Sequence, residues 1–179
     1  VRKAVGCYGI DRKEIVRIAF KGHATPWLGI IPPGTLDSVD VTHLCPYDPA
    51  RAKALLAEAG YGPQKPLAFV LMTSTEESVF HVIGTVIKEQ MSRIGVTTNI
   101  RIVDKVSWMN VATQDGPFDM YVEDLASLMV VDQNVYLSGS TAGWNSTRHI
   151  DKKVDEYYAR YAQELDPAKR KAIAKEFQE

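Results

Sequence analysis

The chain has 179 residues, and 21 lysines and arginines against 22 aspartates and glutamates give it a formal net charge of −1. Hydrophobic residues make up 45% of the sequence and charged residues 24%, which is ordinary for a folded globular domain and excludes a disordered or collagen-like chain. The near-neutral charge argues against a general nucleic-acid-binding protein. No stretch approaches the roughly 18 consecutive apolar residues of a membrane-spanning helix.

Both ends of the sequence fall within predicted helices. Val1 opens a helical-looking segment with no Met and no leader before it, and residues 167–179 read as a helix with no glycine or proline to end it. We therefore expect a domain taken from a longer protein, with any signal peptide absent or already removed.

The first part of the chain predicts a short helix followed by a long loop. Asp11 is placed to cap a helix over residues 12–19, which Gly22 would end. Residues 23–47 contain four prolines, which exclude a long helix or a central strand there. A loop of this length is more often functional than a short connection is.

A proline marks the start of the next helix. Asp48 stands at the N-cap and Pro49 at the first helical position, where its missing N–H costs nothing. Residues 50–59 are strong helix formers, and Gly60 is placed to end the helix in the left-handed conformation.

A βαβ unit follows. Residues 67–72 are a continuous apolar run that predicts a buried strand, and residues 96–103 alternate in a way that predicts a less buried one. Apolar residues recur at helical spacing between them, so the two strands should be parallel with a right-handed crossover. Ser74 or Thr75 is the expected cap of this helix, and Gly95 its end.

The remaining chain predicts one more strand and three helices. Helices are expected over residues 105–113, 151–165 and 167–179, and a strand over residues 118–122. Residues 124–147 show no clean periodicity and favour a loop with a short helical piece. The predicted fold class is α/β, a small mixed sheet with a parallel βαβ unit covered by helices.

Signatures of catalysis and of metal binding are weak. There is no G-x-S-x-G, P-loop or G-x-G-x-x-G motif, and Ser138-Gly139-Ser140 has no strand leading into it. His43 and Cys45 form the one compact nitrogen and sulfur pair, without a second pair at zinc spacing. Cys7 and Cys45 allow at most one internal disulfide, and the usual burial of free cysteine favours two buried, reduced thiols. We expect no catalytic residue, no metal and no cofactor.

Polar residues follow the carboxyl ends of two predicted strands. Thr73 and Ser74 come after the first strand, and Glu123 and Asp124 come after the third. Ligands of open α/β sheets tend to bind outside the carboxyl ends of the strands, so these residues are candidate ligand contacts.

Three segments carry a resemblance to a known family. They read VRKA, IDR and IV within residues 1–16, PPG and YDPARAKALLAEAGY within residues 32–61, and FDM, VDE and DPAKR within residues 118–170. In this order they resemble the extracellular solute-binding proteins of ABC importers, in the dipeptide, oligopeptide and nickel-binding class called family 5. The first segment has one residue more than the family pattern, around residues 6–9.

The resemblance implies a periplasmic-binding-protein-like lobe. Residues 1–179 would form a single domain that is most of the C-terminal lobe of a two-lobed protein, with the N-terminal lobe and the final crossing segment outside it. Such a protein is not an enzyme. It captures a small solute, typically a peptide or peptide-like compound, and delivers it to the membrane permease subunits. The implied location is periplasmic or extracellular, with or without a lipid tether, and the implied state is a monomer without nucleic acid.

The resemblance also suggests where the solute binds. Peptide-binding members carry a W-x-x-D segment whose aspartate pairs with the α-amino group of the peptide. Leu125 and Leu128 stand at these two positions here, and a buried ammonium without its carboxylate is costly. Asp124 or Asp132 is the hypothetical replacement. The candidate ligand-binding residues are Trp27, Thr73, Ser74, Glu123, Asp124, Leu125, Leu128, Asp132, Trp144 and Asn145.

Other functions stay open at this point. The changed W-x-x-D segment also fits a receptor for a sugar, an opine-like compound or a metal chelate. The same lobe serves equally in a ligand-sensing module, which would be recognised by fusion to a kinase or a DNA-binding domain. An unrelated hydrolase is disfavoured by the missing nucleophile motif.

Overall fold

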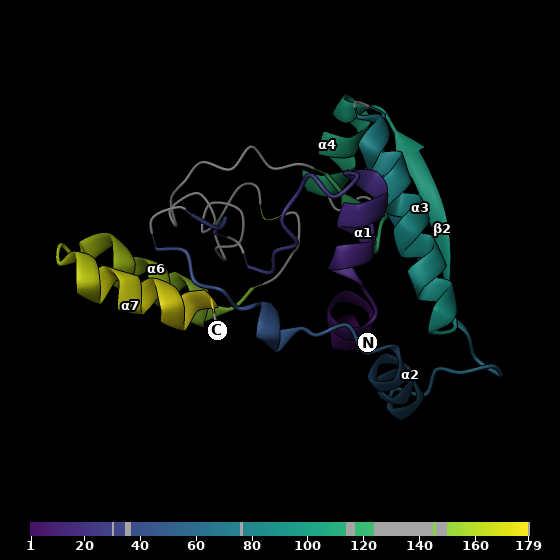
Figure 1. Cartoon of the computed structure of the whole chain (residues 1–179), viewed down its shortest axis with the longest axis horizontal. Helices are drawn as coiled ribbons and strands as arrows, with labels where there is room; N and C mark the ends of the chain where they lie inside the picture. Colours follow the sequence, from purple (N-terminus) through teal and green to yellow (C-terminus); the bar gives the residue numbers. More distant parts are fainter. Residues whose placement is uncertain are drawn as a thin grey trace. The chain divides into compact units, whose positions relative to one another are not determined.

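The computed structural model of the chain describes residues 1–29, 31–34, 37–75, 77–113, 117–123, 145 and 150–178. The chain forms two compact units (Figure 1). Unit 1 comprises Val1–Pro26 and Cys45–Asp124, and unit 2 comprises Trp27–Leu44 and Leu125–Glu179. Across the described ranges, no helix is both long and apolar enough to cross a membrane.

Unit 1 is built on a three-stranded sheet. Its strands are β1 (Leu67–Ser74), β2 (Val96–Val103) and β3 (Met120–Val122), in the spatial order β2-β1-β3. Both pairings are parallel, so the α/β class and the predicted βαβ unit are confirmed. β1 is the central strand, and its residues from Leu71 to Ser74 are all buried.

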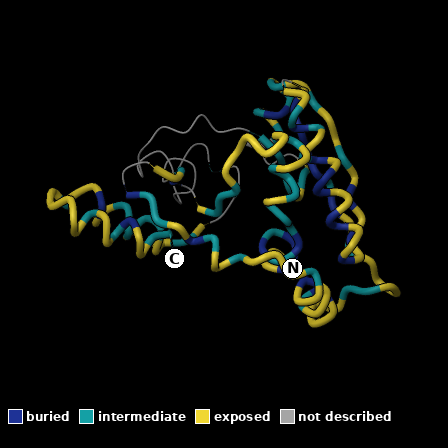
Figure 2. Tube along the Cα trace, in the orientation of Figure 1, coloured by how far each residue is buried: buried dark blue, intermediate teal, exposed yellow. Residues whose placement is uncertain are grey.

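Two helices cover opposite faces of this sheet. α3 (Ser78–Arg93) links β1 to β2, and α4 (Lys105–Thr113) links β2 to β3. Leu71 belongs to the apolar cluster that includes buried residues of α3, whereas its neighbour Met72 packs with Trp108 of α4. Successive strand residues point to opposite faces, so α3 and α4 lie on different sides. Figure 2 shows buried and exposed positions alternating along α3.

Local capping explains where two further helices of unit 1 begin. The Asp11 carboxylate accepts hydrogen bonds from two backbone N–H groups at the start of α1 (Arg12–Ala19). The Asp48 carboxylate accepts from the Arg51 N–H at the start of α2 (Pro49–Glu58), and Gly60 follows that helix at φ +81°. Both predicted caps are confirmed.

The predicted cap of α3 is wrong. Ser74 is the last residue of β1, where it pairs with Val103, and the Thr75 N–H still donates to the Val103 carbonyl at 2.9 Å. α3 therefore starts only at Ser78, after Glu77, whose side chain makes no capping hydrogen bond. The backbone of Ser74 and Thr75 is engaged with β2, so neither residue can act as the N-cap of α3.

A π-helix and a disulfide shape the start of unit 1. Residues Lys3–Tyr8 form the π-helix η1, a form that accommodates one extra residue in a helix and so fits the extra residue seen in the sequence. Cys7 of η1 is bonded to Cys45, with 4.7 Å between the two Cα atoms. The expected reduced thiols are therefore wrong. Sequence spacing could not reveal that these residues, 38 apart, are adjacent.

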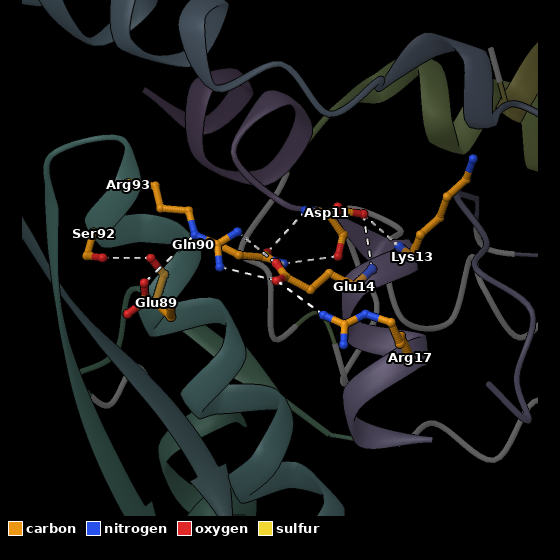
Figure 3. A network of polar contacts seen from close by, with 8 residues as sticks. All are labelled: Asp11, Lys13, Glu14, Arg17, Glu89, Gln90, Ser92 and Arg93. Carbon is orange, nitrogen blue, oxygen red and sulfur yellow. Dashed lines mark hydrogen bonds and ion pairs between the residues drawn. The ribbon is translucent and has the colours of Figure 1, made fainter. Parts of the chain in front are cut away.

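A polar network fastens α1 to α3 (Figure 3). The fully buried Gln90 amide accepts a hydrogen bond from the Asp11 N–H at 3.1 Å. It also donates to the Asp11 carbonyl at 3.1 Å and to the Glu14 carboxylate at 2.9 Å. Arg93 donates two further hydrogen bonds to Glu14, at 2.9 and 3.2 Å. No residue of α1 is fully buried, so we infer that these contacts hold the helix in place.

Glu14 should make the stability of unit 1 depend on pH. Hydrogen bonds from Arg93 and Gln90 lower the pKa of the Glu14 carboxyl below its ordinary value of 4.5. A lowered pKa stabilises the fold above the unfolded-state pKa, and this contribution is lost as the pH falls through the folded-state pKa. Glu14→Gln should cost about 1 kcal/mol at neutral pH, since water at the half-exposed Arg93 weakens the contact.

Urea unfolding at pH 7 and pH 3 checks this expectation. The difference between the wild type and Glu14→Gln should be constant above about pH 5 and shrink at pH 3. Glu89→Gln is the matched control, because Glu89 is 66% exposed and lies 3.8 Å from the same Arg93. An equal loss in both variants, or a difference that grows in acid, would contradict the assignment.

Unit 2 contains a pair of helices packed on part of the proline-rich segment. α6 (Lys152–Gln163) and α7 (Pro167–Gln178) confirm the two helices predicted at the end of the chain, and η2 (Thr42–Leu44) is one 3₁₀ turn. Tyr161 and Ala174, one from each helix, form a small core with Ile31. Residues 124–144 and 146–149, where a loop with a short helical piece was predicted, lie outside the described residues.

Asp37 is a buried carboxylate within unit 2. Its side chain is 2% exposed, accepts a hydrogen bond from the Tyr161 hydroxyl at 2.7 Å and lies 3.5 Å from the Arg170 Nε. The Gln178 side-chain amide donates to its backbone carbonyl at 3.1 Å. Two residues of the DPAKR segment (residues 166–170) stabilise unit 2: Asp166 caps α7, and Arg170 forms an ion pair with Asp37.

Candidate functional site

The carboxyl ends of the three parallel strands meet at one edge of the unit 1 sheet. Ser74 at the end of β1 pairs with Val103 at the end of β2, and Thr73 pairs with Val122 at the end of β3. The residues just beyond these pairs are therefore brought together, as expected for the ligand edge of an open α/β sheet.

Thr73 and Ser74 point to opposite faces at this edge. The Thr73 methyl group would lie 3.2 Å from a Cβ at Gly84 of α3, so Thr73 faces α3. Ser74 consequently faces the α4 side. Both side chains are fully buried, and among the described residues neither hydroxyl has a hydrogen-bond partner. Only Ser74 can join the polar residues on the α4 side.

An ion pair links the ends of the two outer strands. Lys105, the first residue of α4, follows β2, and Glu123 directly follows β3. The Lys105 Nζ lies 3.0 Å from the Glu123 Oε1, and the exposed fractions of the two side chains are 30% and 1%. Sequence reasoning named Glu123 but missed Lys105. The strand-end rule, applied to β2 as it was to β1 and β3, would have pointed to the residues after Val103.

Aromatic side chains support the ion pair from the α4 face. The Lys105 Nζ lies 5.2 Å from the centre of the Trp108 ring, within the range of a cation–π contact. Trp108 is 4% exposed and meets Tyr121 of β3 edge to face at 5.4 Å. Phe118 stands in the same relation to Tyr121 at 5.5 Å. Sequence reasoning missed this cluster because its members lie on separate elements.

The other candidate residues belong to unit 2 or lie outside the described residues. Trp27 belongs to unit 2, where its indole N–H donates to the Ile31 carbonyl at 2.9 Å and closes a turn of the long loop. Asn145 is half-buried. Five candidates lie outside the described residues, as do residues 138–140; the five are Asp124, Leu125, Leu128, Asp132 and Trp144.

The described ranges hold no group of three or more His, Cys, Asp or Glu side chains arranged to bind a metal ion. The sulfur of Cys45 is committed to the disulfide, so it cannot serve with His43 as a thiolate ligand. The sheet edge does hold an ion pair with a buried carboxylate, a serine hydroxyl and a cluster of aromatic rings. A few polar anchors beside aromatic rings are the general form of a small-molecule binding site.

The sequence of the chain matches a known protein family. The family described as bacterial extracellular solute-binding proteins, family 5 Middle, matches residues 1–148. The chain belongs to this family. The resemblance drawn from the three sequence segments is thereby confirmed.

Curated relatives of this family 5 chain are solute-binding proteins. Di/tripeptide-binding protein 2 of Pseudomonas aeruginosa is 30% identical over 186 residues, which cover 99% of this chain and 34% of the relative. The glutathione-binding protein GsiB of Salmonella typhimurium is 36% identical over 104 residues, or 58% of this chain and 20% of the relative. The chain thus spans about a third of the length of the first of these proteins.

Solved structures agree on the fold. The substrate-binding protein CtaP from Listeria monocytogenes superposes with a TM-score of 0.88 at 22% identity, covering 99% of this chain and 36% of that protein. NikA from Staphylococcus aureus, solved with Ni(L-His)₂, gives a TM-score of 0.89 at 19% identity, with coverages of 99% and 38%. The expected binding-protein-like α/β fold of this family 5 chain is confirmed.

Proposed function

We propose that the chain is most of the C-terminal lobe of the solute-binding subunit of an ABC importer. The whole protein captures a small solute between two lobes and delivers it to the permease subunits, without chemical change to the solute. The observation that carries the proposal is the family match over residues 1–148. The strand-end ion pair and aromatic cluster at the sheet edge support a solute contact in this lobe.

The solute is a peptide or a peptide-like compound. Support comes from the printed functions of the relatives, one binding di- and tripeptides and the other glutathione. In this proposal Asp124 or Asp132 supplies the carboxylate for the solute's α-amino group, since Leu128 stands where peptide-binding members have aspartate. A buried ammonium needs such a partner.

The protein acts outside the cytoplasm, in the periplasm or at the cell surface. The extracellular assignment of the family supports this location, and the Cys7–Cys45 disulfide is of the kind that persists in oxidising compartments. We propose that it works as a monomer, with or without a lipid tether, and has no nucleic-acid partner.

Isothermal titration of the intact protein tests the proposed function. The panel contains dialanine, trialanine, glutathione, Ni(L-His)₂ and glucose. We expect a peptide or glutathione to bind with a dissociation constant in the micromolar range or below, and glucose not to bind. Binding of glucose or the nickel chelate without any peptide would contradict the proposed solute class. Residues 1–179 alone serve as a control and should bind at least tenfold more weakly, because they supply only part of the cleft.

A further inference from the structure

The Lys105–Glu123 pair is asymmetric in its exposure to solvent. The Glu123 side chain is 1% exposed and that of Lys105 is 30% exposed, although their charged atoms are 3.0 Å apart. The carboxylate therefore lies beneath the ammonium. Of these two charged groups, the ammonium is the more accessible to a molecule that approaches this edge of the sheet.

The position of the ammonium is fixed from two directions. Glu123 holds it from the end of β3, and the Trp108 ring supports it at 5.2 Å from α4. Burying a carboxylate is costly, and an ion pair of this kind is weak evidence for stability alone. Glu123 and Trp108 together fix the position of the Lys105 ammonium. On an unsupported surface lysine this charge would move freely.

A hydrogen-bond donor lies on the same side of the sheet as the Lys105 ammonium. Ser74, at the end of the central strand, faces the α4 side and is fully buried, and its hydroxyl has no hydrogen-bond partner within the described part of the chain. An unsatisfied buried polar group is costly, and a hydrogen bond to a bound solute would offset that cost. An ammonium and a hydroxyl at one edge favour a group that accepts hydrogen bonds and carries negative charge.

We propose that Lys105 binds a carboxylate group of the solute and that Glu123 is the positioning residue that holds Lys105 for this contact. The inference deepens the proposed function, because it assumes that this sheet edge faces the solute. It assigns the contact at Lys105 to the acidic end of a peptide, because the positive charge of Lys105 would repel an α-amino group.

Matched dipeptides test the selectivity of the intact protein. Dialanine and dialanine amide differ only in the C-terminal charge, and the wild type should bind dialanine at least tenfold more tightly. Lys105→Met, which keeps the length of the apolar stem, should remove this preference, and Lys105→Arg should retain most of it. Glu123→Gln should reduce the preference several-fold without abolishing it. Lys153→Met on the exposed face of α6 is the matched control and should change nothing.

A second readout does not depend on peptide binding. Propionate should shift the indole N–H resonance of Trp108 in the intact protein, because Lys105 lies over that ring, whereas propionamide should not. Lys105→Met should abolish the propionate shift. Peptide binding without this shift would overturn the inference and leave the proposed function standing. A shift without peptide binding would support the inference about Lys105 and contradict the proposed peptide solute.

Two results of the peptide titrations would also overturn the inference. If Lys105→Met keeps the tenfold preference for dialanine, another group binds the carboxylate. If it weakens dialanine and dialanine amide equally, Lys105 has only a structural role.

Discussion

Removal of the Cys7–Cys45 disulfide is expected to lower the free energy of unfolding by about 4 kcal/mol. The bond closes a loop with a sequence separation of 38 residues, and the chain-entropy model gives about 3 kcal/mol for 15 residues and about 4.7 for 100. The bond joins η1 to the segment that leads into α2. A backbone hydrogen bond of 2.9 Å from Asp48 to Tyr8 joins the same two segments but cannot replace a covalent link.

Chemical unfolding of the Cys7→Ala/Cys45→Ala variant measures this loss. Alanine is the proper replacement because Cys7 is 5% exposed, and a serine would bury an unsatisfied hydroxyl. A reducing agent should lower the wild type to the level of the variant and leave the variant unchanged. If both cysteines of the unreduced, denatured protein react with iodoacetamide, the disulfide assignment is wrong.

Asp37→Ala is expected to destabilise unit 2 by about 3 kcal/mol. The substitution removes a buried carboxylate from the Tyr161 hydroxyl and from Arg170, and breaking a buried pair by removing one partner typically costs about 3–5 kcal/mol. We take the lower value because Arg170 is 30% exposed and regains water. Asp37 also has φ +63°, a left-handed conformation that alanine adopts less readily than aspartate.

Asp37→Asn is the matched control for charge and backbone. Asparagine tolerates the left-handed conformation and keeps the side-chain shape, so only the charge is lost, and the cost should fall to about 1–2 kcal/mol. Hydrogen exchange of the α6 and α7 amides measures both variants. Unchanged protection in Asp37→Ala would show that the carboxylate does not hold these helices.

Features encoded by neighbouring residues were predictable from the sequence. Asp11 and Asp48 cap the helices that follow them, and residues 96–103 form β2 at the predicted bounds. These features depend on spacing within a few residues, where capping and periodicity act. The α3 cap failed for the opposite reason. Ser74 has the right chemistry, but it is held in the sheet by Val103 of a distant strand.

The candidate site was only half predictable because it depends on the order of the strands. The strand-end rule found Ser74 and Glu123, and the alternation of side chains already implied that Thr73 and Ser74 cannot face the same side. The contact between Lys105 and Glu123 depends on where β2 and β3 lie in the sheet, which is on either side of β1. No local sequence pattern indicates the order of the strands or the disulfide between Cys7 and Cys45.

Native mass spectrometry of the intact protein, purified from its own host without added ligand, tests the central claim most directly. A receptor for a peptide-like solute should carry a small molecule that is released on denaturation and contains at least one amide bond and a free carboxylate. Competition by dialanine should displace it. A co-purified sugar, or a protein that stays empty and ignores every peptide offered to it, would contradict the account.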